Sequence, residues 1–275
     1  MPFLLASTGA FIGRPNGRDF RLIEKYAPQI RCDGFELMFY EDWYSCTDEL
    51  RFFLKGLAVE LPTFHCDKLI GELLAQERFE EAYSRFEENC RAAAEIGSKL
   101  LVLHLWNGPT SDANIDANIS GYERLLWIAA QYGLTATVEN VIANGGSPLR
   151  HWHSLAKRYP GAAFTYDTKM AQFDLDNEKA FLPDNISLWR RVKHIHLNDR
   201  IGGYRDWSSY RALNLGRGDV DFETFFEGLA KVGYSGGFTV EASAFLPGGG
   251  LDFDGLISSL DRARELIKRH ITAVK

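Results

Sequence analysis

Short apolar runs alternate with longer amphipathic runs along the whole chain. Eight of the short runs are rich in leucine, aromatic or β-branched residues, a pattern typical of buried strands. The predicted strands cover residues 3–7, 34–38, 60–65, 99–104, 135–139, 162–167, 192–197 and 237–241.

Helical periodicity fills the gaps between these strands. It is clearest over residues 76–97, where apolar side chains from Phe79 to Ala94 recur at helical spacing and Gly97 is expected to end the helix. In the helix predicted over residues 221–232, Asp221 is a candidate N-cap. The other predicted helices cover residues 118–132, 221–232 and about 255–270.

Strands separated by helix-length connections pair in parallel through right-handed crossovers. Eight such βα units in 275 residues predict a (β/α)8 TIM barrel of class α/β, formed as a single domain by residues 1–275. The alternative is an open doubly wound sheet. That fold usually has a GxGxxG turn after its first strand, and the sequence STGAFIGRPNG at 7–17 lacks this spacing.

Composition narrows the class of protein further. Apolar residues make up 45% and charged residues 25%, the net charge is -6, and the isoelectric point is about 5.7. This acidic balance disfavours nucleic acid as a partner. No stretch has the ~20 apolar residues of a membrane span, and the start of the chain lacks a basic signal-peptide region. The cysteines show no CxxC pair, so we expect free thiols in a cytoplasmic protein.

The ends of the predicted strands carry polar side chains. In residues 135–139, alternation puts Glu139 on the same face as Thr137, opposite Val138. If the large apolar residues face the helices, the polar residues face the barrel axis and meet at the C-terminal mouth. The residues concerned are Glu36, His65, His104, Glu139, Asp167, His194, His196 and Glu241.

Several carboxylates buried together repel one another, and a divalent cation removes that repulsion. Carboxylate oxygens combined with imidazole nitrogen suit Mn²⁺, Zn²⁺, Co²⁺, Fe²⁺ or Mg²⁺. A chain of this length needs no metal to stabilise its core, so we expect one divalent metal ion with a functional role.

Five segments together resemble the xylose isomerase-like TIM-barrel superfamily, which contains sugar phosphate isomerases and epimerases. They are VEN at 138–140, YD at 166–167, HIHLND at 194–199, GRGDVDF at 216–222 and TVEAS at 239–243. The resemblance extends over nearly the whole chain. Its motifs are specific to the superfamily but not to the substrate of any one member.

The resemblance implies a set of metal ligands, namely Glu139, Asp167, His196 and Glu241. In epimerase members, two carboxylates that match Glu139 and Glu241 exchange the substrate proton. The resemblance therefore implies a sugar isomerase or epimerase of carbohydrate metabolism, acting through a metal-stabilised enediolate. A Lewis-acidic metal and two carboxylates that flank one carbon suit this reaction.

One position departs from the family pattern. Many epimerase members have a histidine three residues after the metal-binding aspartate, whereas this chain has Met170, preceded by Lys169. Lys169 is a candidate to bind a substrate carboxylate, phosphate or enolate. Asp199 is expected to hold a neighbouring arginine. The candidates for substrate binding are His65, His104, Glu36, Lys169, His194 and Arg217.

Several alternatives stay open. The first is dehydration of a cyclic or acidic sugar, as in inosose dehydratases, and the second is a barrel that binds a sugar without turnover. An endonuclease IV-like nuclease is disfavoured by the acidic balance. The expected partner is a small sugar, and a homo-oligomer is compatible with the sequence.

Overall fold

Eight parallel strands form a closed barrel in the order β1 to β8 in the computed structural model, which describes residues 2–108 and 111–271. This arrangement confirms the predicted (β/α)8 fold. The strands are β1 Leu4–Ser7, β2 Gly34–Met38, β3 Thr63–His65, β4 Leu100–Leu103, β5 Thr135–Glu139, β6 Ala163–Asp167, β7 Val192–Leu197 and β8 Gly237–Val240.

Helices occupy the connections between the strands. The α-helices are α1 Leu22–Tyr26, α2 Thr47–Lys55, α3 Leu69–Ala75, α4 Phe79–Glu95, α5 Ile115–Gln131, α6 Pro148–Arg158, α7 Thr168–Phe173, α8 Pro183–Ile186, α9 Phe222–Lys231 and α10 Asp254–Leu266. A π-helical turn, Ile267–Ile271, follows α10. Short 3-10 turns cover Thr8–Ala10, Arg14–Asn16, Ala27–Gln29, Glu41–Cys46, Ser187–Arg191 and Trp207–Ser209.

The predicted helix boundaries hold to within a few residues. Helix α4 begins at Phe79 rather than at residue 76, because Glu77 has a positive φ of 58° that a helix does not allow. The chain leaves this helix through Gly97, whose φ is +89°, as expected of a glycine beyond a helix C-terminus. Asp221 caps α9 by accepting a hydrogen bond from the backbone N–H of Thr224, as predicted.

The internal contacts divide the chain into two compact units. Unit 1 comprises Met1–Phe35 and Tyr166–Lys275, and unit 2 comprises Glu36–Thr165.

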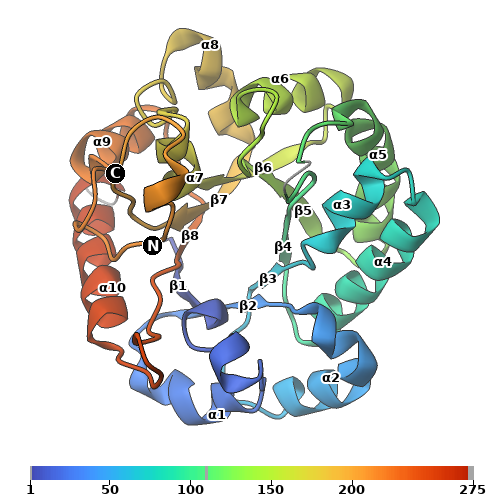
Figure 1. Cartoon of the computed structure of the whole chain (residues 1–275), viewed down its shortest axis with the longest axis vertical. Coiled ribbons are helices and arrows are strands. Elements are labelled where there is room, and N and C mark those ends of the chain that lie inside the picture. Colours follow the sequence, from blue (N-terminus) through green and yellow to red (C-terminus); the bar gives the residue numbers. More distant parts are fainter. Residues whose placement is uncertain (1, 109–110, 272–275) are drawn as a thin grey trace. The chain divides into compact units, whose positions relative to one another are not determined.

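In unit 2, neighbouring strands align so that polar side chains satisfy one another. Val102 of β4 is aligned with Thr137 of β5, and Glu139 with Thr165 of β6. The Thr137 hydroxyl donates to the carbonyl of Leu101 over 2.7 Å and lies 2.6 Å from the Thr165 hydroxyl. Outside the strands, α3, α4 and α5 pack against one another (Figure 1).

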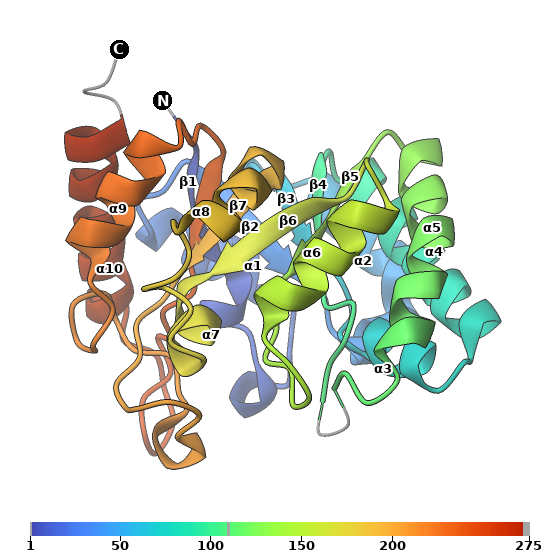
Figure 2. The ribbon, with the colours of Figure 1, turned by 90° about the horizontal axis from the view of Figure 1, so that it is seen from above.

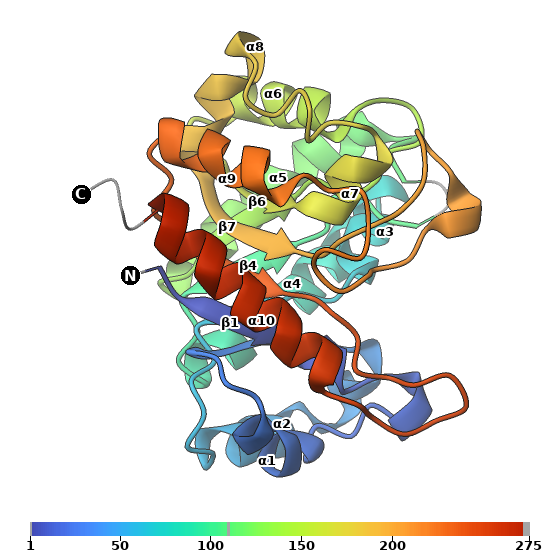
Figure 3. The ribbon, with the colours of Figure 1, turned by 90° about the vertical axis from the view of Figure 1, so that its left-hand side faces the viewer.

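In unit 1, β7, β8 and β1 are consecutive neighbours. Thr239 of β8 is aligned with His196 on one side and with Leu5 on the other. Helix α10 packs against β1 and β8 (Figure 3), with α9 as its neighbour (Figure 2). Together these contacts fix the end of β8, where Glu241 follows the strand.

Two further predictions concern membrane-spanning helices and the cysteines. None of the helices within 2–108 and 111–271 is both long enough and apolar enough to cross a membrane. The four cysteines, which all lie in these ranges, are free thiols, as expected.

Candidate functional site

The strands of unit 1 end in three of the four predicted metal ligands. Asp167 is the last residue of β6, His196 lies on β7, and Glu241 directly follows β8. The backbone N–H of Glu241 donates to the carbonyl of Leu197 over 3.1 Å, so the pairing of β7 with β8 continues through this residue. Asp167 and His196 are fully buried, whereas the Glu241 side chain is 15% exposed. Glu241 is therefore the ligand candidate that solvent or a substrate can reach.

These three side chains lie together around Asn198. His196 Nδ1 is 3.6 Å from Glu241 Oε1. The amide nitrogen of Asn198 donates to Asp167 Oδ2 and to Glu241 Oε2, over 3.0 Å in each case. Unit 1 thus brings together two carboxylates and an imidazole, with one neutral donor between the carboxylates.

Asp167 also begins a helix. Its Oδ1 accepts a hydrogen bond of 2.5 Å from the backbone N–H of Met170 and so caps α7. The helix-capping and ligand interpretations of Asp167 are therefore compatible, because the carboxylate has several electron pairs and each hydrogen bond uses one of them.

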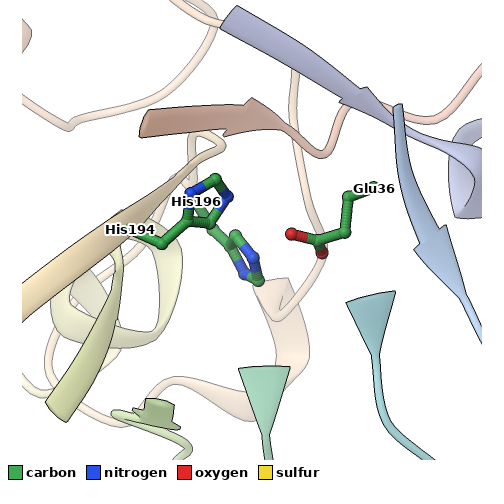
Figure 4. Close-up of side chains that lie close together, drawn as sticks. All are labelled: Glu36, His194 and His196. Atoms are coloured by element: carbon green, nitrogen blue, oxygen red, sulfur yellow. The ribbon is translucent and has the colours of Figure 1, made fainter. Parts of the chain in front are cut away.

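His194 lies two residues before His196 on β7, and Figure 4 labels both imidazoles. The Nε2 atom of His194 is 2.7 Å from the hydroxyl of Thr239. His194 is almost fully buried, and a histidine with a purely structural role would make the same contact with a threonine hydroxyl. Glu36 is fully buried and is aligned with Thr63 of β3.

Unit 2 holds a second cluster, at the ends of β3, β4 and β5. Its members are His65, His104 and Glu139, all of them buried. Glu139 Oε2 is 2.6 Å from Nε2 of His104 and 3.4 Å from Nε2 of His65. The sequence assigned both histidines to the substrate, and the structure brings them to the carboxylate predicted to bind the metal.

The other ring nitrogen of each histidine faces an acceptor, which fixes the tautomer. His65 Nδ1 is 3.0 Å from the carbonyl of Cys66. His104 Nδ1 is 3.0 Å from Oδ1 of Asn107, whose amide nitrogen in turn donates to Glu72 over 2.7 Å. A proton on Nδ1 of each imidazole satisfies these acceptors and leaves the electron pair of Nε2 facing Glu139.

The charges of the groups in this cluster are compatible with a bound cation. Burial lowers the pKa of His104 to about 4, although Glu139 acts in the opposite direction. His104 Nε2 is buried and lies in short contact with the Glu139 carboxylate. Three electron-pair donors that lie within 4.8 Å of one another fit a divalent cation.

The two cationic candidates differ in their surroundings. Lys169, in the first turn of α7, is half-buried, and its backbone N–H donates to Asn198 Oδ1 over 2.9 Å. Its ammonium group lies 5.3 Å from the centre of the Tyr210 ring. Arg217 lies in the exposed loop that precedes α9. Its backbone N–H donates to the carbonyl of Asn214.

Asp199 organises that loop. Its carboxylate accepts from the backbone N–H groups of Gly216, Gly218, Val220 and Arg200 over 2.8–3.1 Å. The expectation that Asp199 holds an arginine side chain is wrong in detail. The guanidinium of Arg200 donates instead to the carbonyls of Gly202, Gly203 and Asp206. A carboxylate in a tight loop satisfies backbone donors that would otherwise be buried without partners.

The sequence patterns above do not single out the amides and the carboxylate that orient the candidate ligands. They are Asn198, Asn107 and Glu72. For Asn198 a signal existed, since it stands two residues after His196 and alternation puts both on the same face. Asn107 and Glu72 are 35 residues apart and carried no local signal.

Comparisons with known proteins identify relatives at the level of family and fold. A family model described as "Xylose isomerase-like TIM barrel" matches residues 25–265. None of the curated proteins is a significant sequence match.

Solved structures of several sugar epimerases share the fold. A D-tagatose 3-epimerase-like protein is 18% identical with a TM-score of 0.74, covering 99% of this chain and 100% of its own. The 3-keto-D-glucoside 4-epimerase YcjR from E. coli is 20% identical with a TM-score of 0.66, covering 98% and 100%. A D-allulose 3-epimerase from Methylomonas sp., solved with D-allulose, is 17% identical with a TM-score of 0.70, covering 98% and 97%.

Proposed function

The chain belongs to the xylose isomerase-like TIM barrel family, and we propose that it is a divalent-metal-dependent isomerase or epimerase of a small sugar or sugar derivative. The observation that carries the proposal is the pair of carboxylate–imidazole clusters at the strand ends. One contains Asp167, His196 and Glu241, and the other contains Glu139 between two histidines. Groups of this kind are costly to bury unless they bind a cation or a substrate.

We propose that Glu139, Asp167, His196 and Glu241 hold one divalent ion. Each stands at or near the carboxyl end of its strand, and the carboxyl ends of all strands in a (β/α)8 barrel open at one face. Three carboxylates and one imidazole form a donor set suited to Mn²⁺, Mg²⁺, Co²⁺, Fe²⁺ or Zn²⁺. Such an ion would polarise a sugar carbonyl and stabilise the negative charge that develops on its oxygen.

Glu139 and Glu241 are the proposed catalytic residues, which remove and return the proton on the carbon next to that carbonyl. The amide nitrogen of Asn198 donates to Oε2 of Glu241, and Oε1 lies 3.6 Å from Nδ1 of His196. Because the Glu241 side chain is partly exposed, it can exchange a proton with a bound substrate. In unit 2, His104 beside Glu139 can accept a proton or a hydrogen bond through Nε2.

The remaining polar groups are proposed substrate contacts. They are His65, His104, Glu36, Lys169, His194 and Arg217. Lys169 is the best placed to bind an anionic group, since its backbone is bonded to Asn198, which contacts two proposed ligands.

Solvent exchange tests this proposal directly. The protein is incubated with Mn²⁺ in D₂O together with D-tagatose, D-allulose, L-ribulose or a 3-keto-glucoside, and the products are followed by NMR. We expect deuterium at the inverted carbon of at least one sugar. Glu241→Gln should slow the exchange by about 10²–10⁴-fold, the usual contribution of a general acid or base.

Glu265→Gln, on the exposed face of α10, is the matched control and should exchange at the wild-type rate. Full turnover by Glu241→Gln on the same sugar would exclude the proposed acid/base role.

Dehydration of a cyclic or acidic sugar is the second candidate. The observation that favours it is Met170, a buried methionine at the position where many epimerase members have a histidine. Mass spectrometry of the same reaction products distinguishes the two reactions, because dehydration lowers the mass of the product by one water and epimerisation does not.

A further inference from the structure

Asn198 follows β7 and is completely buried, and its side-chain amide makes three hydrogen bonds. The nitrogen donates to Asp167 Oδ2 and Glu241 Oε2, and the oxygen accepts from the backbone N–H of Lys169. Its backbone is fixed as well, since both its N–H and its carbonyl bond to the hydroxyl of Thr168, over 3.1 and 2.6 Å.

The bond from Lys169 determines which way the amide faces. A backbone N–H can only donate, so it must meet Oδ1 of Asn198. The nitrogen is then turned towards the two carboxylates, and both of its hydrogens are used. A flipped amide would direct its oxygen at two anions and leave the Lys169 N–H without its acceptor.

The consequences for the two carboxylates differ. Asp167 has both oxygens engaged, one by Asn198 and one by the N–H of Met170. Glu241 is engaged by Asn198 at Oε2, while Oε1 lies 3.6 Å from Nδ1 of His196. Because the amide is neutral, it holds the carboxylates in place without cancelling the charge that attracts a cation.

We propose that Asn198 is a positioning residue for the metal centre. It sets the spacing of Asp167 and Glu241 and rotates Glu241 so that Oε1 is the oxygen presented to the cation and the substrate. This inference rests on the proposed function, because it assigns Asn198 a purpose at the same site.

Two substitutions separate this role from simple anchoring of the backbone. Asn198→Asp keeps the size of the side chain and the acceptor for Lys169, but it replaces the donor with a third negatively charged oxygen. Asn198→Ala removes the donor and the acceptor together. Asn185→Asp, on α8, introduces the same change of charge outside the cluster and is the control.

The measurements are the melting temperature of the chelator-treated and Mn²⁺-loaded proteins, Mn²⁺ affinity by calorimetry, and kcat and KM on the sugar identified above. Metal-free Asn198→Asp should have a lower melting temperature than both the wild type and Asn198→Ala, because three carboxylates then meet in a buried space. Mn²⁺ should raise its melting temperature by more than that of the wild type, while kcat falls. Asn198→Ala should lose about 10–100-fold in Mn²⁺ affinity or kcat, as is typical of groups that orient a ligand.

If Asn198→Asp matches the wild type in metal-free melting, Mn²⁺ response and kcat, the amide only anchors the backbone and the inference is wrong. A different pattern would refute the proposed function itself. A wild-type protein that neither binds Mn²⁺ nor exchanges any sugar proton, beside a destabilised metal-free Asn198→Asp, would leave the spacing role supported and the metal-dependent activity excluded.

Discussion

The Nε2 atom of His104 lies 2.6 Å from Oε2 of Glu139, and both atoms are buried. When Nδ1 of a neutral His104 donates to the oxygen of Asn107, Nε2 carries an electron pair that faces the carboxylate oxygen of Glu139. Two such atoms at this separation repel one another unless a proton or a cation lies between them. The state of this pair therefore depends on pH and on metal.

Acid should destabilise the metal-free protein through His104. Burial lowers its pKa to about 4, below the ordinary value of 6.5, so the folded state favours the neutral imidazole. The corresponding stability is complete above pH 6.5 and is lost as the pH falls towards 4, by up to about 3 kcal/mol. Urea unfolding in the presence of a chelator, at several pH values, measures this loss. His104→Gln should show a shallower decline between pH 6.5 and 4, and an unchanged decline would contradict the prediction.

Removal of metal should abolish turnover without unfolding the protein. The core does not require an ion, because a chain of this length buries enough apolar surface by itself. We expect chelation to lower the melting temperature and to stop deuterium exchange, and added Mn²⁺ or Co²⁺ to restore both. Elemental analysis of the purified protein gives the metal content. Full turnover of protein shown to be free of metal would count against the proposed mechanism.

Asp199→Ala should destabilise the loop before α9. Four backbone N–H groups would lose their acceptor, and the expected loss of unfolding free energy is about 3–5 kcal/mol. Urea denaturation provides the measurement. Asp219→Ala is the control. Among the residues that the structure describes, this exposed carboxylate accepts a hydrogen bond from Gly202 alone, and its removal should cost about 0.5 kcal/mol or less. Equal losses in the two variants would show that Asp199 is not the centre of this loop.

Gly71→Ala should disturb His104 through the backbone. A Cβ at position 71 of α3 would collide with the carbonyl oxygen of His104 and lie 3.0 Å from the carbonyl carbon of Leu105. The helix or the end of β4 must shift, at an expected cost of about 1–3 kcal/mol. Gly161→Ala meets no atom of the described residues within 4 Å and should be nearly neutral. Thermal melting compares the two, and wild-type stability of Gly71→Ala would contradict the close approach.

The strands were predictable because their patterns are short-range. Residues 34–38, 135–139 and 192–197 were predicted with the bounds that β2, β5 and β7 have. The third strand is shorter than predicted and begins at Thr63, directly after Pro62, which lacks the N–H that a sheet requires.

The candidate site was predictable only in part, for a related reason. Alternation and strand position find Glu139 and His196, since both properties belong to a single strand. The partners that orient a side chain come from elsewhere in the chain. The bond from Asn107 to Glu72 depends on how α3 packs beside the end of β4, which no local pattern encodes. The loop before α9 likewise takes its shape from hydrogen bonds between Asp199 and backbone groups 17 to 21 residues away.

Asp167 caps α7 with one oxygen and receives Asn198 on the other. The start of a helix and a neighbouring amide thus hold this carboxylate in one orientation before any ion arrives. Uptake of an ion would then require no folding step at this residue, and its rate would be set by how fast the ion sheds its water. Slow loading that accompanied a structural transition would not be expected of such a centre.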